Sequence, residues 1–163
     1  MKEILLQYAA YNLWSNKRIT EAILKLPAEK IKQPLISSFP SIELTLLHLM
    51  NVEYIWWQRM KLVENLHVIE EKTLSIEQIS YKLLELSLQW KDWVEKSTQA
   101  AFEHEFVYRN SKTEQFKQPV FQTLLHLFNH QTYHRGQIVT MLRNIGVEKI
   151  PTTDFIVWSR GKK

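Results

Sequence analysis

The chain of 163 residues contains no cysteine, only three glycines and only five prolines. The absence of cysteine excludes a disulfide scaffold, a thiolate metal site and a cysteine nucleophile, and it fits a reducing compartment. So few glycines and prolines cannot supply the many turns of a β-sandwich or barrel, and the long stretches without either favour helices. A metal ion in this protein would need His, Asp or Glu as its ligands.

The chain also lacks long hydrophobic runs and a charge of one sign. No apolar run approaches the roughly 18 residues that a membrane-spanning helix needs, and the polar N-terminal segment does not fit a secretory signal. The 21 basic and 17 acidic residues are scattered, and the small terminal cluster of Arg160, Lys162 and Lys163 does not make a basic stripe. We expect a single cytoplasmic domain over residues 1–163, with no membrane and no nucleic-acid partner.

Apolar residues recur at helical spacing in four long segments. Ser41 is placed to cap the second segment, and Ser75 with Gln78 makes a capping-box pattern ahead of the third. Residues 101–119 could form a short β-hairpin between the third and fourth helices, and the apolar tail from Phe155 to Trp158 could pack back on the helices. These patterns predict an all-α fold, a four-helix bundle. For three of the four segments the sequence predicts both ends: Glu3 to Leu26, about Ile42 to Leu62, and Pro119 to near Gly146.

Three of the six histidines stand at successive i, i+4 steps on the fourth helix: His126, His130 and His134. Each step rises about 6 Å, so two adjacent members can share one metal ion, whereas the outer two are about 12 Å apart. Spacing alone leaves open which adjacent pair is used. The HxxxH pair of His130 and His134 has the ligand spacing of helical zinc motifs.

His48 lies near the middle of the apolar face of the second helix and is the obvious third ligand. Three histidines would leave a coordination position for water or substrate, which is typical of catalytic metal sites. The alternative interpretation is a hydrogen-bonded core histidine without a metal. His67 and His104 fall in loop-like segments and are expected on the surface.

Several catalytic classes have no motif here. The sequence from His130 to His134 lacks the Glu that follows the first His in zinc metalloproteases, which excludes that class. There is no GxSxG elbow, Walker A loop or GxGxxG turn, so nucleotide chemistry has no support.

Four segments resemble the DinB family of DinB/YfiT-like metal-dependent enzymes. YNLWSNKR at 11–18 is similar to the family pattern YNxWxNxR, and NHQTYHRGQI at 129–138 is similar to NHxxxHRGQI. The segments at 41–48 and 151–155 match its second-helix motif and its tail. The resemblance implies an up-down-down-up four-helix bundle, frequently a homodimer, with a divalent metal such as zinc or nickel. Carried over by position, the ligands are His48, His130 and His134.

The resemblance makes His126 a neighbour of the site and not a ligand. It also shows one departure, because many relatives carry a further His where this chain has Tyr133. The resemblance does not specify which reaction the protein catalyses. A three-histidine site could activate water or a thiol, as in a hydrolase or a thiol S-transferase of the bacillithiol type. The alternative is a non-catalytic stress-response or binding module in which the metal ties two helices together.

No general base stands out in the sequence. Glu43, Glu53 and Asp154 are candidates only because they are acidic, and a solvated carboxylate is the default expectation for Glu53. An anionic thiol would need positive charge near the site. Arg135, Arg59 or Lys61 could supply it, although a structural or solvated role is the stronger expectation for each of them.

Overall fold

The computed structural model describes residues 1–110 and 112–161. Ser111 of the expected hairpin turn, and Lys162 and Lys163 of the terminal basic cluster, lie outside the described residues. The described chain is mostly helical with one small two-stranded sheet, as predicted, and none of its helices is long and apolar enough to span a membrane. The long helices are α1 (Lys2–Ile23), α3 (Ile42–Met60), α4 (Ile76–Lys96) and α6 (Val120–Asn144), and the shorter elements are α2 (Ala28–Lys32), α5 (Gln99–Glu103), β1 (Glu105–Arg109), β2 (Gln115–Pro119) and α7 (Phe155–Arg160).

Two of the long helices, α3 and α4, begin directly after their predicted capping residues. Ser41 Oγ accepts a hydrogen bond from the backbone N–H of Leu44 at 3.1 Å, and Ser75 and Gln78 form the reciprocal bonds of a capping box. The ends of the first two helices were predicted too late. α1 ends at Ile23, and α3 ends at Met60 because Leu62 adopts a positive φ of 56° that a helix cannot continue.

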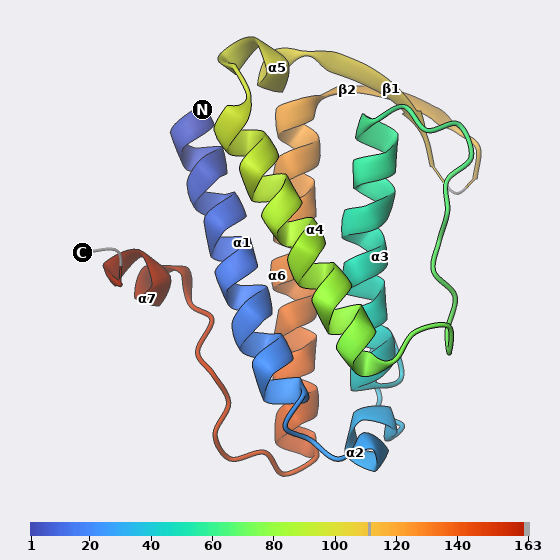
Figure 1. Cartoon of the computed structure of the whole chain (residues 1–163), viewed down its shortest axis with the longest axis vertical. Helices are drawn as coiled ribbons and strands as arrows, with labels where there is room; N and C mark the ends of the chain where they lie inside the picture. The colour runs from blue at the N-terminus through green and yellow to red at the C-terminus, as the bar shows by residue number, and fades with distance from the viewer. Residues whose placement is uncertain (111, 162–163) are drawn as a thin grey trace.

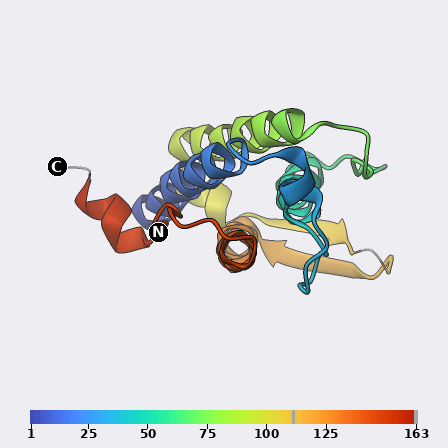
Figure 2. The same ribbon diagram turned by 90° about the horizontal axis from the view of Figure 1, so that it is seen from below.

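The four long helices lie side by side (Figure 1). α1 packs against α4 and α6, and α3 packs against the same two helices. Seen from below, the hairpin lies beyond α3 and α6, on the side away from α4 (Figure 2). The tail does pack back on α1, because the Phe155 ring lies 5.4 Å from that of Tyr8 and 5.2 Å from that of Tyr11.

A layer of buried polar residues divides the core into two apolar clusters. One cluster includes Leu5, Trp90 and Phe128, and the other is built around residues that include Leu46 and Ile138. Each of the four long helices contributes to the polar layer, and the metal-binding candidates of α6 lie at the same level. The layer consists of Asn12, Asn16, Glu53, Ser87, Gln131 and Arg135.

Candidate metal centre

The fold brings His48 of α3 together with His130 and His134 of α6. One ring nitrogen from each residue lies within 4.8 Å of the other two, and Nε2 of His48 is 3.1 Å from Nε2 of His130. Two nitrogens bound to one zinc ion at about 2.0 Å in tetrahedral geometry would lie about 3.3 Å apart. The spacing of these two rings therefore fits a shared divalent ion.

The protonation state of the rings also fits a metal. Burial, together with the charge of the neighbouring His134 ring, lowers the pKa of His48 to about 4 and that of His130 to about 3. The neutral imidazole is the form that binds a metal ion. Both rings are therefore ready to act as ligands at neutral pH without losing a proton.

Residues around the group hold two of its rings in place. Nδ1 of His134 lies 2.7 Å from Oε1 of Gln137, whose Nε2 in turn donates to Ser38 Oγ at 2.8 Å. Because an amide oxygen can only accept, Nδ1 carries the proton and Nε2 of His134 is left free to bind a metal. The ring of Phe39 stacks on His48 with centroids 4.1 Å apart.

His130 has no such support on its other nitrogen. Its Nδ1 is buried and has no hydrogen-bond partner among the residues that the structure describes. A buried polar atom without a partner is rare in proteins and often marks the place of a water or an ion. This orphaned nitrogen belongs to the same ring that already approaches His48.

The remaining histidines lie outside the group. The ring of His126 is 5.8 Å from that of His130 and packs against Trp56 at 5.5 Å, with much of its surface exposed. His67 and His104 are exposed, as the sequence predicted. The pair on α6 that joins His48 is therefore His130 and His134, a choice that helical spacing alone left open.

The expectation of a solvated Glu53 is wrong. This residue is 0% exposed, and its carboxylate accepts hydrogen bonds from Asn12 at 2.9 Å, from Asn16 at 3.2 Å and from Ser87 at 2.9 Å. Burial raises its pKa to about 7, although these hydrogen bonds and Arg135 act in the opposite direction. Enclosed in the core, it is not available as a general base for a substrate in the site.

Arg135 is likewise part of the interior and cannot supply charge to a bound thiol. It is 1% exposed, and its Nη1 donates to Asn12 Oδ1 at 2.6 Å and to Asn16 Oδ1 at 2.9 Å. Sequence analysis missed this pairing, which joins the signature segment of α6 to that of α1. The available signal was the i, i+4 spacing of the two asparagines, which puts both amides on one helical face.

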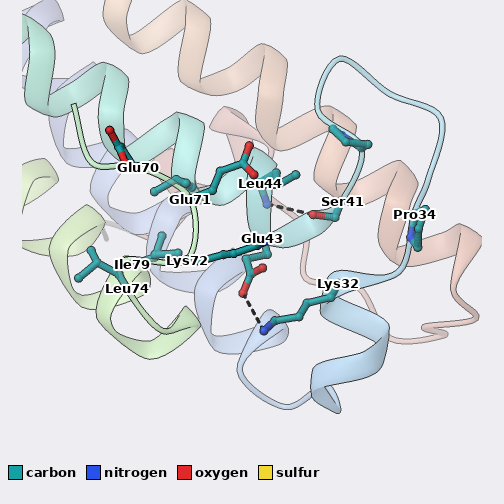
Figure 3. Close-up of a pocket in the computed structure, with 12 residues that line it drawn as sticks. Lys32, Pro34, Ser41, Glu43, Leu44, Glu70, Glu71, Lys72, Leu74 and Ile79 are labelled. Atoms are coloured by element: carbon teal, nitrogen blue, oxygen red, sulfur yellow. Dashed lines mark hydrogen bonds and ion pairs between the residues drawn. The ribbon is translucent and has the colours of Figure 1, made fainter.

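The other acidic candidates lie away from the histidines. Glu43 pairs with Lys32 at 3.7 Å, and Asp154 accepts a hydrogen bond from Thr152 at 2.8 Å just before α7. Glu43 and Lys32 line a cavity of about 390 Å³ beside the N-terminus of α3 (Figure 3). The lining of this cavity includes none of the three clustered histidines.

Comparison with known proteins places these features in a family. The profile of the DinB family matches residues 1–160. The chain belongs to the DinB family. It is 30% identical to "Protein DinB" of Bacillus subtilis (strain 168) over 166 residues, which covers 93% of this chain and 92% of that protein. The crystal structure of a DinB-like protein from Bacillus cereus ATCC 10987 matches with a TM-score of 0.69, covering 92% of this chain and 95% of that one. At 16% identity this second match shows a shared fold.

Proposed function

We propose that His48, His130 and His134 hold one divalent metal ion, zinc or nickel, in a site that activates water or a thiol for hydrolysis or thiol transfer. The observation that carries the proposal is the convergence of three ring nitrogens from two helices within 4.8 Å. Three protein ligands would leave room for a fourth group. When bound, such an ion lowers the pKa of a coordinated water or thiol enough to make it a nucleophile near neutral pH.

The chain's own residues prepare this site. Gln137 holds the proton on Nδ1 of His134, and Phe39 covers one face of the His48 ring against water. In the part of the chain that the structure describes, no carboxylate joins the histidine group. A nucleophile in this site, whether water or a thiol, would therefore depend on the ion and not on a neighbouring carboxylate for its deprotonation.

The same lack of a base supports a second candidate function, a metal-stabilised binding or stress-response module without turnover. His48 and His130 lie 82 positions apart in the chain. An ion held by both would join α3 to α6, and its binding free energy would add to the free energy of unfolding. This candidate needs the same three ligands and differs only in having no substrate chemistry.

We also propose that residues 1–163 form a single domain with the up-down-down-up bundle topology of DinB-like proteins, and that two copies form a homodimer. Support for the dimer comes from the family resemblance and from exposed apolar residues on α1, where Ile4 is 58% and Tyr8 39% exposed. Light scattering during size-exclusion chromatography tests it. We expect the mass of two chains, and a single-chain mass at micromolar concentration would contradict the dimer.

The metal proposal is tested by elemental analysis of protein purified without a chelator or a nickel column. We expect about one divalent ion per chain in the wild type, loss of the ion in His48→Ala, and retention in the surface control His104→Ala. Absence of metal from the wild type, together with a melting temperature that added zinc does not change, would overturn the proposal. If metal is bound, assays of thiol transfer to electrophiles and of hydrolysis separate the enzyme from the binding module.

A further inference from the structure

Two residues of the α1 signature segment, Trp14 and Arg18, belong neither to the histidine group nor to the buried polar layer. The Arg18 guanidinium lies over the Trp14 ring, 5.0 Å from its centroid, and Nε of Arg18 donates a hydrogen bond to the backbone carbonyl of Thr152 at 3.1 Å. These two contacts hold the guanidinium in one orientation. Its Nη1 and Nη2 donate to no other residue that the structure describes, so their N–H groups remain for a ligand or solvent.

Arg18 lines a cavity of about 390 Å³ between the C-terminal part of α1 and the segment that follows α6. This segment passes beside the end of α1 before it reaches α7 (Figure 1). The lining shares no residue with the histidine group or with the cavity of Figure 3. Both sides of the cavity contribute apolar residues to the lining: Ala22 and Leu26 from one side, and Val147, Ile150 and Pro151 from the other.

The charged part of the lining is mostly basic. Arg18, Lys25 and Lys149 supply three positive charges, and Glu21 supplies one negative charge. The Glu21 carboxylate already faces Lys17, which is not part of the lining, at 4.0 Å. Lys25 and Lys149 make no hydrogen bond or ion pair with any described residue. The three cations therefore share one cavity without an acidic partner of their own.

The ends of the two adjoining helices do not account for this charge. The C-terminal end of a helix attracts cations, but the effect fades within the last turn. Arg18 lies more than one turn before Ile23, the last residue of α1. At the end of α6, the carbonyl of Ile145 accepts a hydrogen bond at 3.0 Å from Lys30, which does not line the cavity. The helix ends therefore account at most for Lys25.

The donors of this cavity fit a phosphate group attached to a small apolar body. An arginine presents a planar fork of donors that matches phosphate oxygens, and lysines add charge without a fixed direction. A dianionic phosphate gains more from three cations than a carboxylate does. Arg59 and Lys61, the other basic candidates, do not line this cavity, and each stacks on a tryptophan of α3, at 4.6 and 5.1 Å.

We propose that Arg18, Lys25 and Lys149 bind the phosphate group of a small phosphorylated molecule in this cavity, with the apolar residues covering its body. Arg18 and Lys25 come from α1 and its end, and Lys149 comes from the segment after α6. A bound ligand would therefore tie that segment to α1. The site is separate from the histidine group and does not depend on the proposed function.

Calorimetric titration with phenyl phosphate at low salt tests the site, with phenol as the neutral probe and inorganic phosphate as the probe without an apolar body. We expect phenyl phosphate to bind with a dissociation constant of about 1 mM or below, inorganic phosphate to bind more weakly, and phenol not to bind. Arg18→Gln should weaken phenyl phosphate about tenfold, and Lys149→Gln about threefold. Arg109→Gln, which removes the same charge from an exposed position on β1, should leave the affinity unchanged.

Two of these comparisons keep the inference separate from folding defects and from the metal proposal. Lys149 makes no hydrogen bond that its substitution would break, so Lys149→Gln decides the matter if Arg18→Gln, which also loses the bond to Thr152, does not fold. The titration is repeated in His48→Ala, because phosphate is itself a ligand for divalent ions. Retained binding there supports this cavity, whether or not the histidines hold a metal.

Three outcomes would overturn the inference. The first is no binding of phenyl phosphate, or the same affinity in wild type, Arg18→Gln and Lys149→Gln. The second is binding that disappears in His48→Ala, which would assign the phosphate to the histidine group. The third is binding of a short DNA duplex without binding of phenyl phosphate, which would make the basic residues a surface for nucleic acid.

Discussion

Nη1 of Arg135 donates a hydrogen bond to Oδ1 of Asn12 over 2.6 Å, although 123 residues separate the two in the chain. The bond joins the middle of α6 to the middle of α1 inside the polar layer. It gives a structural role to two residues of the family signature that do not belong to the histidine group. The layer beneath the candidate metal centre is therefore a network in which Nη1 of Arg135, the two asparagine amides and the Glu53 carboxylate bond to one another.

Removing the guanidinium from this network should be costly. Arg135→Met leaves Oδ1 of Asn12 and of Asn16 without this donor, and a buried polar group left unsatisfied costs about 1–3 kcal/mol. We expect this loss in the free energy of unfolding measured with urea. Arg143→Met, at an exposed position near the end of the same helix, should change it by less than about 0.5 kcal/mol. A loss below about 1 kcal/mol at Arg135 would contradict the structural role.

Glu53 should make stability depend on pH. Its pKa is raised to about 7 in the folded protein, so the folded state holds the proton more tightly than the unfolded state, whose ordinary value is 4.5. The stabilisation is therefore full below pH 4.5 and is lost as the pH rises through 7. Glu53→Gln cannot titrate, so wild type should lose up to about 3 kcal/mol relative to this variant between pH 5 and 8.

Thermal melts of both proteins across that pH range measure the difference, and the exposed Glu95→Gln variant is the control. This control should run parallel to wild type throughout. If the curves of wild type and Glu53→Gln are also parallel, Glu53 keeps an ordinary pKa in the folded protein and the prediction is wrong.

Gln137 should tune the affinity for the metal without binding it. Gln137→Leu removes the acceptor from Nδ1 of His134, so the ring loses its fixed tautomer and orientation. Loss of such a supporting hydrogen bond typically weakens metal binding about 10–100-fold. Competition with a chromophoric chelator measures the change, and Gln122→Leu, at an exposed position of α6, should have wild-type affinity.

The two neighbouring histidines of α6 should behave differently. His126→Ala should keep the wild-type metal content, because this ring lies outside the group, whereas His130→Ala should lose the ion. Elemental analysis of the two variants side by side gives the answer. Equal loss of metal from both variants would mean that His126 and His130 are the ligands on α6 and that His134 does not bind the ion.

The sequence was sufficient for the long helices and for the caps of α3 and α4, because hydrophobic periodicity and the bonding of Ser41 and Ser75 are local. It did not show the short helices α2, α5 and α7, whose five or six residues are too few to reveal a period. His48 was expected as a ligand from its place on the apolar face of its helix, and spacing showed that two adjacent histidines of α6 could join it. Which pair they are, His130 and His134, came from the family resemblance, because helical spacing is the same for both pairs.

The interior polar layer was beyond the reach of sequence reasoning for the same physical reason. A carboxylate next to an apolar stripe is ordinarily solvated, and only the partners across the bundle make burial of Glu53 tolerable. Those partners come from Asn12, Asn16 and Ser87 on two other helices. Local spacing carries no information about such an encounter.

His134 and Arg135 are adjacent in the chain and therefore leave α6 about 100° apart. One contributes to the histidine group and the other is fastened to Asn12 and Asn16 of α1. A rotation of α6 about its axis that moved the imidazoles away from His48 would also break the hydrogen bonds from Arg135 to Asn12 and Asn16. These bonds therefore fix the rotation of α6 about its axis. Folding already fixes the positions of the histidine rings, so the entropy cost of ordering them does not fall on metal binding. An ion should therefore bind with little rearrangement of the protein.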